Sequence, residues 1–183
     1  MPPMPMQSEA KKRLPLVSGV VLLAFALVAA LWASSYFSAE ARVRRATARI
    51  VQLVQKAQAE APVSLGLSAN RLGGYLALDA TLELEGYGLL ATGRKEIVQV
   101  YVQIRNSFQQ VEFSGSRIAA VSMGAGEMRS SVAARYRFVA EGGEVLAGNG
   151  QATLRWIKGE EGWQIAAAAL KPDPAASIPK DWP

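Results

Sequence analysis

The feature that most constrains this chain is an uncharged run near its N-terminus. From Leu14 to Ala39 there are 26 residues without a charged side chain. Because a helix rises about 1.5 Å per residue, about 20 apolar residues span the hydrocarbon core of a bilayer. Trp32 and Tyr36 stand near the C-terminal end of the run, and aromatic rings favour the headgroup layer. The run therefore predicts one transmembrane helix over residues 14–37.

A cleaved signal peptide is the alternative interpretation, because basic residues precede the run. Signal peptides have a shorter apolar core of about 7–15 residues, so we favour a retained anchor. The basic residues before the run favour a cytoplasmic N-terminus, although the arginines that follow it leave the orientation less certain than the span. We expect residues 1–13 to be a disordered cytoplasmic segment of a single-pass cell-membrane protein. The domain that follows is then periplasmic or extracellular.

The charges on both sides of the run predict a membrane interface. The residues expected there, with the two aromatic ones, are Lys11, Lys12, Arg13, Trp32, Tyr36, Arg42, Arg44 and Arg45. Between residues 61 and 170, ten basic residues balance ten acidic ones. The excess positive charge therefore borders the apolar run, where anionic lipid attracts it, and nucleic acid is not an expected partner. A plain solvated helix face remains the alternative for the arginines.

The composition also excludes whole classes of chemistry. The chain has no histidine and no cysteine. It therefore lacks the commonest general base, the commonest metal ligand and the thiolate ligands of zinc. Serine–histidine and cysteine–histidine mechanisms cannot operate within it. We expect no cofactor and no metal.

Periodicity predicts three helices after the apolar run. Residues 38–60 repeat apolar side chains at three- and four-residue steps and predict an amphipathic juxtamembrane helix that belongs to the domain. Residues 64–78 predict a weaker helix after Pro62. Residues 94–108 predict a third, with Thr92 as its N-cap.

Alternation with period two predicts strands, at 79–85 and then over most of the remaining domain. The later strands are expected at 111–121, 129–139, 145–157 and 163–170, with a bend at Gly115. A Pro-rich extended tail follows over 171–183. The predicted class is α+β: a single N-terminal transmembrane helix, then a conical domain over 61–170 with three helices packed on a curved four- to five-stranded, mainly antiparallel sheet.

Two short motifs resemble the nuclear transport factor 2-like superfamily, in particular its SnoaL-like branch. Asp79-Ala-Thr-Leu-Glu-Leu, with Gly86-Tyr-Gly and Gly93-Arg-Lys-Glu-Ile, is similar to the first strand, loop and helix entry of that family. Trp156-Ile-Lys-Gly-Glu-Glu-Gly-Trp-Gln-Ile is similar to its closing hairpin. The resemblance implies a membrane-anchored member with a pocket between sheet and helices. Enzymes of the family use an Asp or His base with Tyr or Asp donors, and no such set can be matched here.

Three aromatic residues on predicted apolar faces are the candidates to line that pocket: Tyr101, Tyr136 and Trp156. The simpler interpretation is that they are core residues with hydrogen-bonded polar tips. Asp79, Glu83 and Glu85 could include a base, but a solvated strand face is the favoured alternative. Arg94 and Arg105 could bind an anion, but their positions on the helix favour exposure.

The function that follows is a membrane-anchored, non-catalytic binding or assembly module. Its expected partners are membrane lipid and either a second copy of the chain or another envelope protein. Two alternatives stay open. One is a protein that binds a small hydrophobe in the pocket of the fold. The other is an isomerase- or hydrolase-type enzyme, which needs a buried carboxylate of raised pKa beside a tyrosine.

Overall fold

The computed structural model describes residues 38–57 and 61–173. The chain divides into two compact units, Met1–Ser38 and Ala39–Pro183, and the fold below is that of the second. Within the described ranges, no helix is both long and apolar enough to cross a membrane. The span predicted over 14–37 lies outside these ranges, as do Lys11, Lys12, Arg13, Trp32 and Tyr36.

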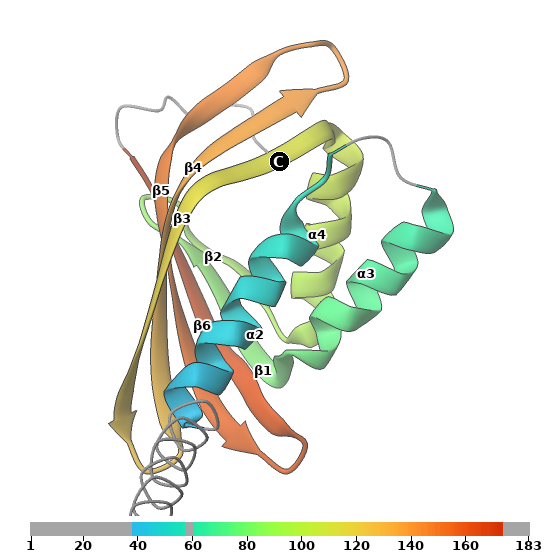
Figure 1. Ribbon diagram of the computed structural model, residues 1–183. Coiled ribbons are helices and arrows are strands. Elements are labelled where there is room, and N and C mark those ends of the chain that lie inside the picture. The colour runs from blue at the N-terminus through green and yellow to red at the C-terminus, as the bar shows by residue number, and fades with distance from the viewer. Residues whose placement is uncertain (1–37, 58–60, 174–183) are drawn as a thin grey trace, which may run out of the picture. The chain divides into compact units, whose positions relative to one another are not determined.

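The domain is built from three helices and six strands (Figure 1). In chain order they are α2 (Ala39–Val54), α3 (Pro62–Gly74), β1 (Leu76–Leu84), β2 (Gly88–Thr92), α4 (Arg94–Ser107), β3 (Phe108–Gly124), β4 (Glu127–Ala140), β5 (Val145–Gly159) and β6 (Gly162–Pro172). The helix predicted over 38–60 ends at Val54. The helix predicted over 64–78 ends at Gly74, and the last three residues of that predicted range are the first three of β1.

The strands form one sheet in the order β2-β1-β6-β5-β4-β3. All neighbours are antiparallel except β1 and β6, which run parallel. The α+β class and the three helices are confirmed, but the prediction of four to five mainly antiparallel strands is wrong in number and misses the parallel pair. The missed strand, β2, is five residues long, and its sequence Gly-Leu-Leu-Ala-Thr has no period-two alternation.

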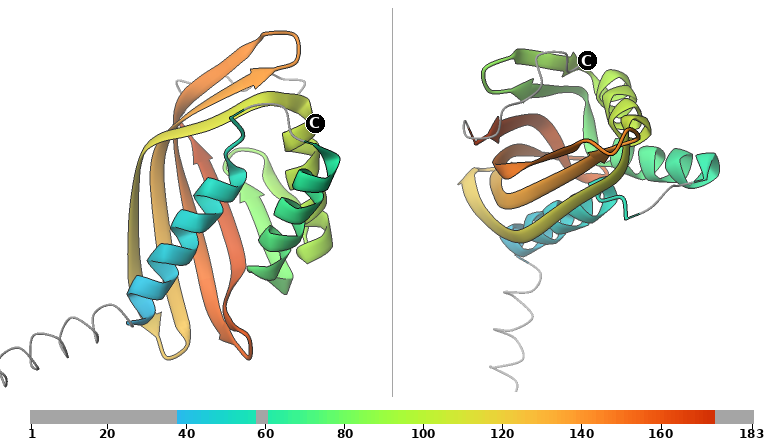
Figure 2. Two further views of the ribbon diagram at one scale, coloured as in Figure 1. Left: turned by 45° about the vertical axis from the view of Figure 1, so that its right-hand side comes forward. Right: turned by 90° about the horizontal axis from the view of Figure 1, so that it is seen from above.

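The sheet curves, and the three helices lie on its concave side (Figures 1 and 2). Part of the curvature arises at Gly115, where the predicted bend is confirmed. Its φ of 63° coincides with a register shift between Ser114 and Arg117. A bulge at a glycine of positive φ bends a strand because the extra residue is left out of the ladder.

The core lies between the concave face and the helices. Val43, Leu72, Leu76, Ile97, Met128, Leu154, Trp156 and Ile165 are among its buried members. Strands β4 and β5 contribute through strict alternation, because every second residue of a strand points to the same face. The opposite, convex face of the sheet carries no helix (Figure 2), and its side chains stand in solvent.

The third helix begins differently from the prediction. Its N-cap is Gly93, whose φ is 87°, and Thr92 makes no capping hydrogen bond through its side chain. Instead, the Glu96 carboxylate accepts the backbone N–H of Thr92 at 2.9 Å. The acidic side chain in the first turn thus ties the start of α4 to the end of β2.

Candidate functional site

Two of the three candidate pocket residues, Tyr101 and Trp156, are buried in the core with 6% and 0% of their surface exposed. The Trp156 indole N–H donates to Ser130 Oγ at 2.8 Å. The Tyr101 hydroxyl donates to the backbone oxygen of Leu53 at 2.9 Å. Both polar tips therefore already have partners within the protein.

Ser130 is the centre of a buried polar network. Its hydroxyl lies 2.9 Å from the Thr47 hydroxyl, which itself donates to the backbone oxygen of Val43 at 2.9 Å. The single Thr47 hydroxyl proton is used in that bond. The Ser130 hydroxyl therefore donates its proton to the Thr47 hydroxyl oxygen. The network joins α2 to β4 and β5 inside the region where the fold would hold a ligand.

Arg105 corrects the sequence analysis most clearly. It was expected to be exposed, but only 2% of its surface is accessible. Its Nη1 donates to the backbone oxygens of Leu53, Val54 and Gln55 at 2.9, 3.0 and 2.6 Å. Its guanidinium also lies 5.5 Å from the centre of the Tyr101 ring, so Arg105 satisfies the C-terminal carbonyl groups of α2.

Lys56 makes the reciprocal contact. Its Nζ donates to the backbone oxygens of Arg105 and Phe108, each at 2.6 Å. Its own backbone pairs with Val111 through two bonds of 2.8 Å. The ends of α2 and α4 are therefore each held by a cation from the other. Arg94 is engaged as well, because its Nε donates to the backbone oxygen of Leu76 at 2.9 Å.

The carboxylates do not assemble an acid–base site in the described part of the domain. Asp79, Glu83 and Glu85 are exposed, and Glu85 pairs with Lys171 at 2.8 Å. Across the described residues, Asp173 alone among the acidic side chains is half-buried, and the others are exposed. No group of three or more metal-ligating side chains occurs in the same ranges.

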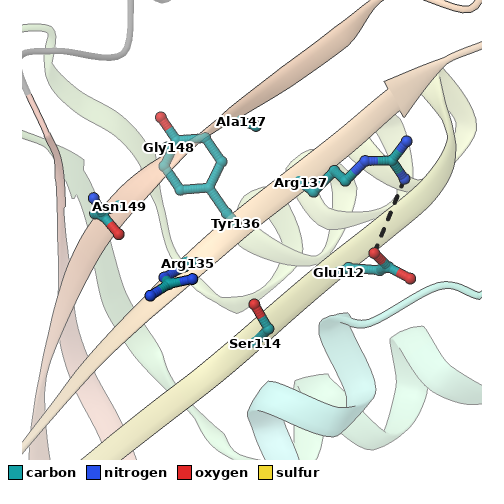
Figure 3. A pocket seen from close by; sticks show the side chains of 8 residues that line it. All are labelled: Glu112, Ser114, Arg135, Tyr136, Arg137, Ala147, Gly148 and Asn149. Atoms are coloured by element: carbon teal, nitrogen blue, oxygen red, sulfur yellow. Dashed lines mark ion pairs between the residues drawn. The ribbon is translucent and has the colours of Figure 1, made fainter.

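The third candidate, Tyr136, borders an open hollow of about 440 Å³. The hollow is lined by Glu112, Ser114, Arg135, Tyr136, Arg137, Ala147, Gly148 and Asn149 (Figure 3). It exists because β5 has almost no side-chain volume at Ala147 and Gly148, next to the long side chains of β4. Arg137 is held at its rim, 4.0 Å from Glu112 and 2.9 Å from the side-chain oxygen of Gln110.

Tyr136 has the one buried side-chain polar atom without a hydrogen-bond partner among the described residues, its hydroxyl oxygen. The ring lies against β5, where a Cβ added to Gly150 would be 3.4 Å from it. Burial, and second the nearby charge of Asp173, raise the pKa of Tyr136 above its ordinary value. An unpartnered buried atom costs free energy, and the described residues supply no hydrogen-bond partner for this hydroxyl.

The convex face of the sheet carries a second candidate surface. Arg117, Arg129 and Arg135 are exposed there and make no ion pair within the described residues. Other cations of this face are paired, as Arg155 is with Glu127 at 3.6 Å. We call these three unpaired residues the arginine face.

Small side chains separate the members of the arginine face. Ala119, Ser131, Thr153 and Ala169 lie opposite one another in a row across β3, β4, β5 and β6. Ala133 lies directly across from Arg117 and two residues from Arg135. The centre of the convex face is therefore a shallow surface of small side chains bordered by arginines.

The arginines predicted to meet the membrane begin α2. Arg42 and Arg44 are exposed and Arg45 is half-buried, while Val43 between them is fully buried. The buried valine fixes which side of the helix faces the sheet, and Arg42 and Arg44 point to solvent.

Comparisons with known proteins identify the class of fold. No protein-family model and no curated protein matches this sequence. Among solved structures, an NTF2-like protein with a cystatin-like fold from Novosphingobium aromaticivorans superposes with a TM-score of 0.54 at 13% identity, over 85% of this chain and 94% of that one. A proposed scytalone dehydratase from the same organism gives 0.53 at 15% identity, over 76% and 93%. LinA gives 0.52 at 14% identity, over 59% and 74%.

The domain therefore has the nuclear transport factor 2-like, cystatin-like fold, as the sequence resemblance implied. Identities of 13–15% show a common fold and carry no activity from one protein to another. The function must be argued from this chain's own surfaces.

Proposed function

We propose that this chain is a membrane-tethered, non-catalytic binding module that receives an acidic surface of another envelope protein on the arginine face. The observation that carries this proposal is the set of three exposed arginines without ion-pair partners in the described domain. The tether is the uncharged run over residues 14–37.

The shape and charge of the surface support a protein partner. Because Ala133 and Ser131 are small, a partner's backbone can approach the sheet closely and place carboxylates beside Arg117 and Arg135. Arginine forms bidentate bonds to carboxylates, which fix orientation as well as supply energy. Two copies that met through this face would bring like charges together at a cost, so a different, acidic protein fits better than a second copy.

The interior supports a non-catalytic role. Trp156, Tyr101 and Arg105 occupy the region between sheet and helices, and each uses its polar atoms on the protein itself. A general base would need a carboxylate of perturbed environment within reach of a substrate. With the exception of Asp173, the carboxylates of the described residues stand in solvent.

The test is site-specific crosslinking in native membranes. A photoreactive amino acid replaces Ala133 in the full-length chain, and the crosslinked protein is identified. We expect one dominant partner whose contact surface is acidic. The double variant Arg117→Glu/Arg135→Glu is expected to lose the adduct, whereas Lys95→Glu, an exposed reversal on α4, retains it. An adduct only with a second copy, or one that survives the double reversal, contradicts the proposal.

A second candidate is supported by the hollow at Tyr136. Its unpartnered hydroxyl, near Asp173, is the single place in the described domain where a tyrosine and a half-buried carboxylate come together. This arrangement could bind, or act on, a small molecule with a hydrogen-bond acceptor. Native mass spectrometry of protein extracted from membranes tests it. A bound small molecule that disappears in Tyr136→Phe would favour this function, and empty protein in both forms would exclude it.

A further inference from the structure

The start of α2 and the tip of the β3–β4 hairpin lie at the same end of the domain (Figure 1). They are aligned by the contact of 2.9 Å between Thr47 and Ser130. From Thr47 the helix runs back eight residues to Ala39, about 12 Å. From Ser130 the strand runs back four residues to Gly126, about 13 Å. The two ends are therefore level with each other.

The tip exposes apolar side chains to solvent. Val121 and Met123 are 59% and 49% exposed on the last residues of β3, and the cross-strand partner of Val121 is the exposed Arg129 near the start of β4. The segment from Val121 to Gly126 contains no charged residue, and the turn itself consists of Gly124, Ala125 and Gly126. The β4 side of the tip carries the exposed Glu127 and Arg129, so the tip combines two exposed apolar side chains with balanced charge, a composition suited to an interface.

We propose that this tip is a second membrane contact, in which Val121 and Met123 enter the headgroup layer of the bilayer while Arg42 and Arg44 bind lipid phosphates. The inference rests on the proposed tether. If the span ends at residue 37, only Ser38 separates it from α2, so the start of α2 lies at the headgroups. The tip, at the same end of the domain as the start of α2, is then within reach of the same layer. Apolar side chains beside exposed arginines are the composition that favours binding at an anionic interface.

The β5–β6 turn is more acidic than the tip. It adjoins the tip, because the Lys158 N–H donates to the Gly126 backbone oxygen at 2.9 Å. It carries Glu160 and Glu161, both exposed, which anionic lipid repels. Of the two turns, we expect the β3–β4 tip to meet lipid, because it carries one exposed carboxylate, Glu127, where the β5–β6 turn carries two.

The absence of cysteine makes a single-label experiment clean. Full-length chain with Ala125→Cys carries an environment-sensitive fluorophore and is reconstituted in vesicles of phosphatidylcholine with phosphatidylglycerol. We expect a shift of emission to shorter wavelength and quenching by spin labels attached to the lipid chains. A label at Glu160→Cys, at the same end of the domain, and one at Gly142→Cys, in the β4–β5 turn, are expected to remain in water.

The double variant Val121→Asn/Met123→Asn changes only exposed side chains and is expected to abolish the quenching of the Ala125→Cys label. Circular dichroism confirms that the variant is folded. A label at Ala125→Cys that stays as wet as that at Gly142→Cys overturns the inference. The inference is also overturned if the label emits at shorter wavelength but is not quenched by the spin labels on the lipid chains, because this result indicates a protein contact. Extraction with alkaline carbonate tests the tether separately. Release of the protein from the membrane would contradict the tether, and with it the proposed function.

Discussion

The buried arginine offers the most direct test of how this domain is held together. Arg105→Met keeps the length of the side chain and removes its charge and its donors. Arg105 Nη1 donates to three backbone oxygens at the end of α2. One of them, Leu53 O, also accepts the Tyr101 hydroxyl, so it keeps a partner in the variant. Val54 O and Gln55 O lose the donor that Arg105 supplies.

The magnitude follows from these two acceptors. A fully buried acceptor left without its donor costs about 1–3 kcal/mol, and these two bonds are part-buried, so each loss lies toward the lower end of that range. Removal of a buried charge returns part of its desolvation cost, so the two losses do not add in full. We expect Arg105→Met to lower the free energy of unfolding by about 2–4 kcal/mol, a large share of the stability of a single domain.

Urea unfolding of residues 39–183, which form their own compact unit, measures this change when it is followed by far-ultraviolet circular dichroism. Lys95→Met is the matched control, because Lys95 is exposed on the same helix. It is expected to change the free energy of unfolding by less than about 0.5 kcal/mol. If Arg105→Met is destabilised no more than this control, the arginine does not stabilise the end of α2, and the argument from its hydrogen bonds is refuted.

Three further predictions concern single residues. Trp156→Phe removes the donor to Ser130 and should cost about 1–3 kcal/mol in the same unfolding assay; an unchanged midpoint would show that the buried network is not stabilising. Gly93→Ala places a Cβ on a residue with φ of 87° and should cost about 1–2 kcal/mol, with retention of full stability as the contrary result. Tyr136→Phe concerns pH. Because burial and the charge of Asp173 raise the pKa of Tyr136, the folded state holds its proton more tightly. This stabilisation is present below about pH 10, the ordinary tyrosine value, and is lost as pH rises through the raised pKa. The variant should lose less stability than wild type above pH 10, and equal losses would contradict the assignment.

Local patterns predicted many of the elements and part of the core. Alternation along β4 placed Val132 and Tyr136 on one face and Arg135 and Arg137 on the other, and the register shows this arrangement. The apolar stripe of α4 placed Ile97 in the core, where it is 7% exposed. These predictions hold because a residue's neighbours at two, three or four positions are set by backbone geometry alone.

The span predicted over residues 14–37 also rests on a local pattern. Residues 14–37 carry their signal in length and apolarity, which need no tertiary contact to be recognised. The span stays a prediction, because the described residues do not include it. Arg42 and Arg44 are exposed on α2, and their contact with lipid is likewise a prediction.

Tertiary structure alone decided the rest. Arg105 follows Tyr101 by four residues, so it lies on the buried side of α4, yet an arginine can be buried only where acceptors await it. Those acceptors come from α2, about fifty residues earlier in the chain. The parallel pairing of β1 with β6 joins segments at opposite ends of the domain, and no local period reports a pairing of that kind. The hollow at Tyr136 and the arginine face arise in the same way, because side chains from β3, β4 and β5 become neighbours only when the strands pair. The sequence therefore predicted most of the elements and proposes an anchor that the described residues do not include, while the sites depend on which distant side chains the fold brings together.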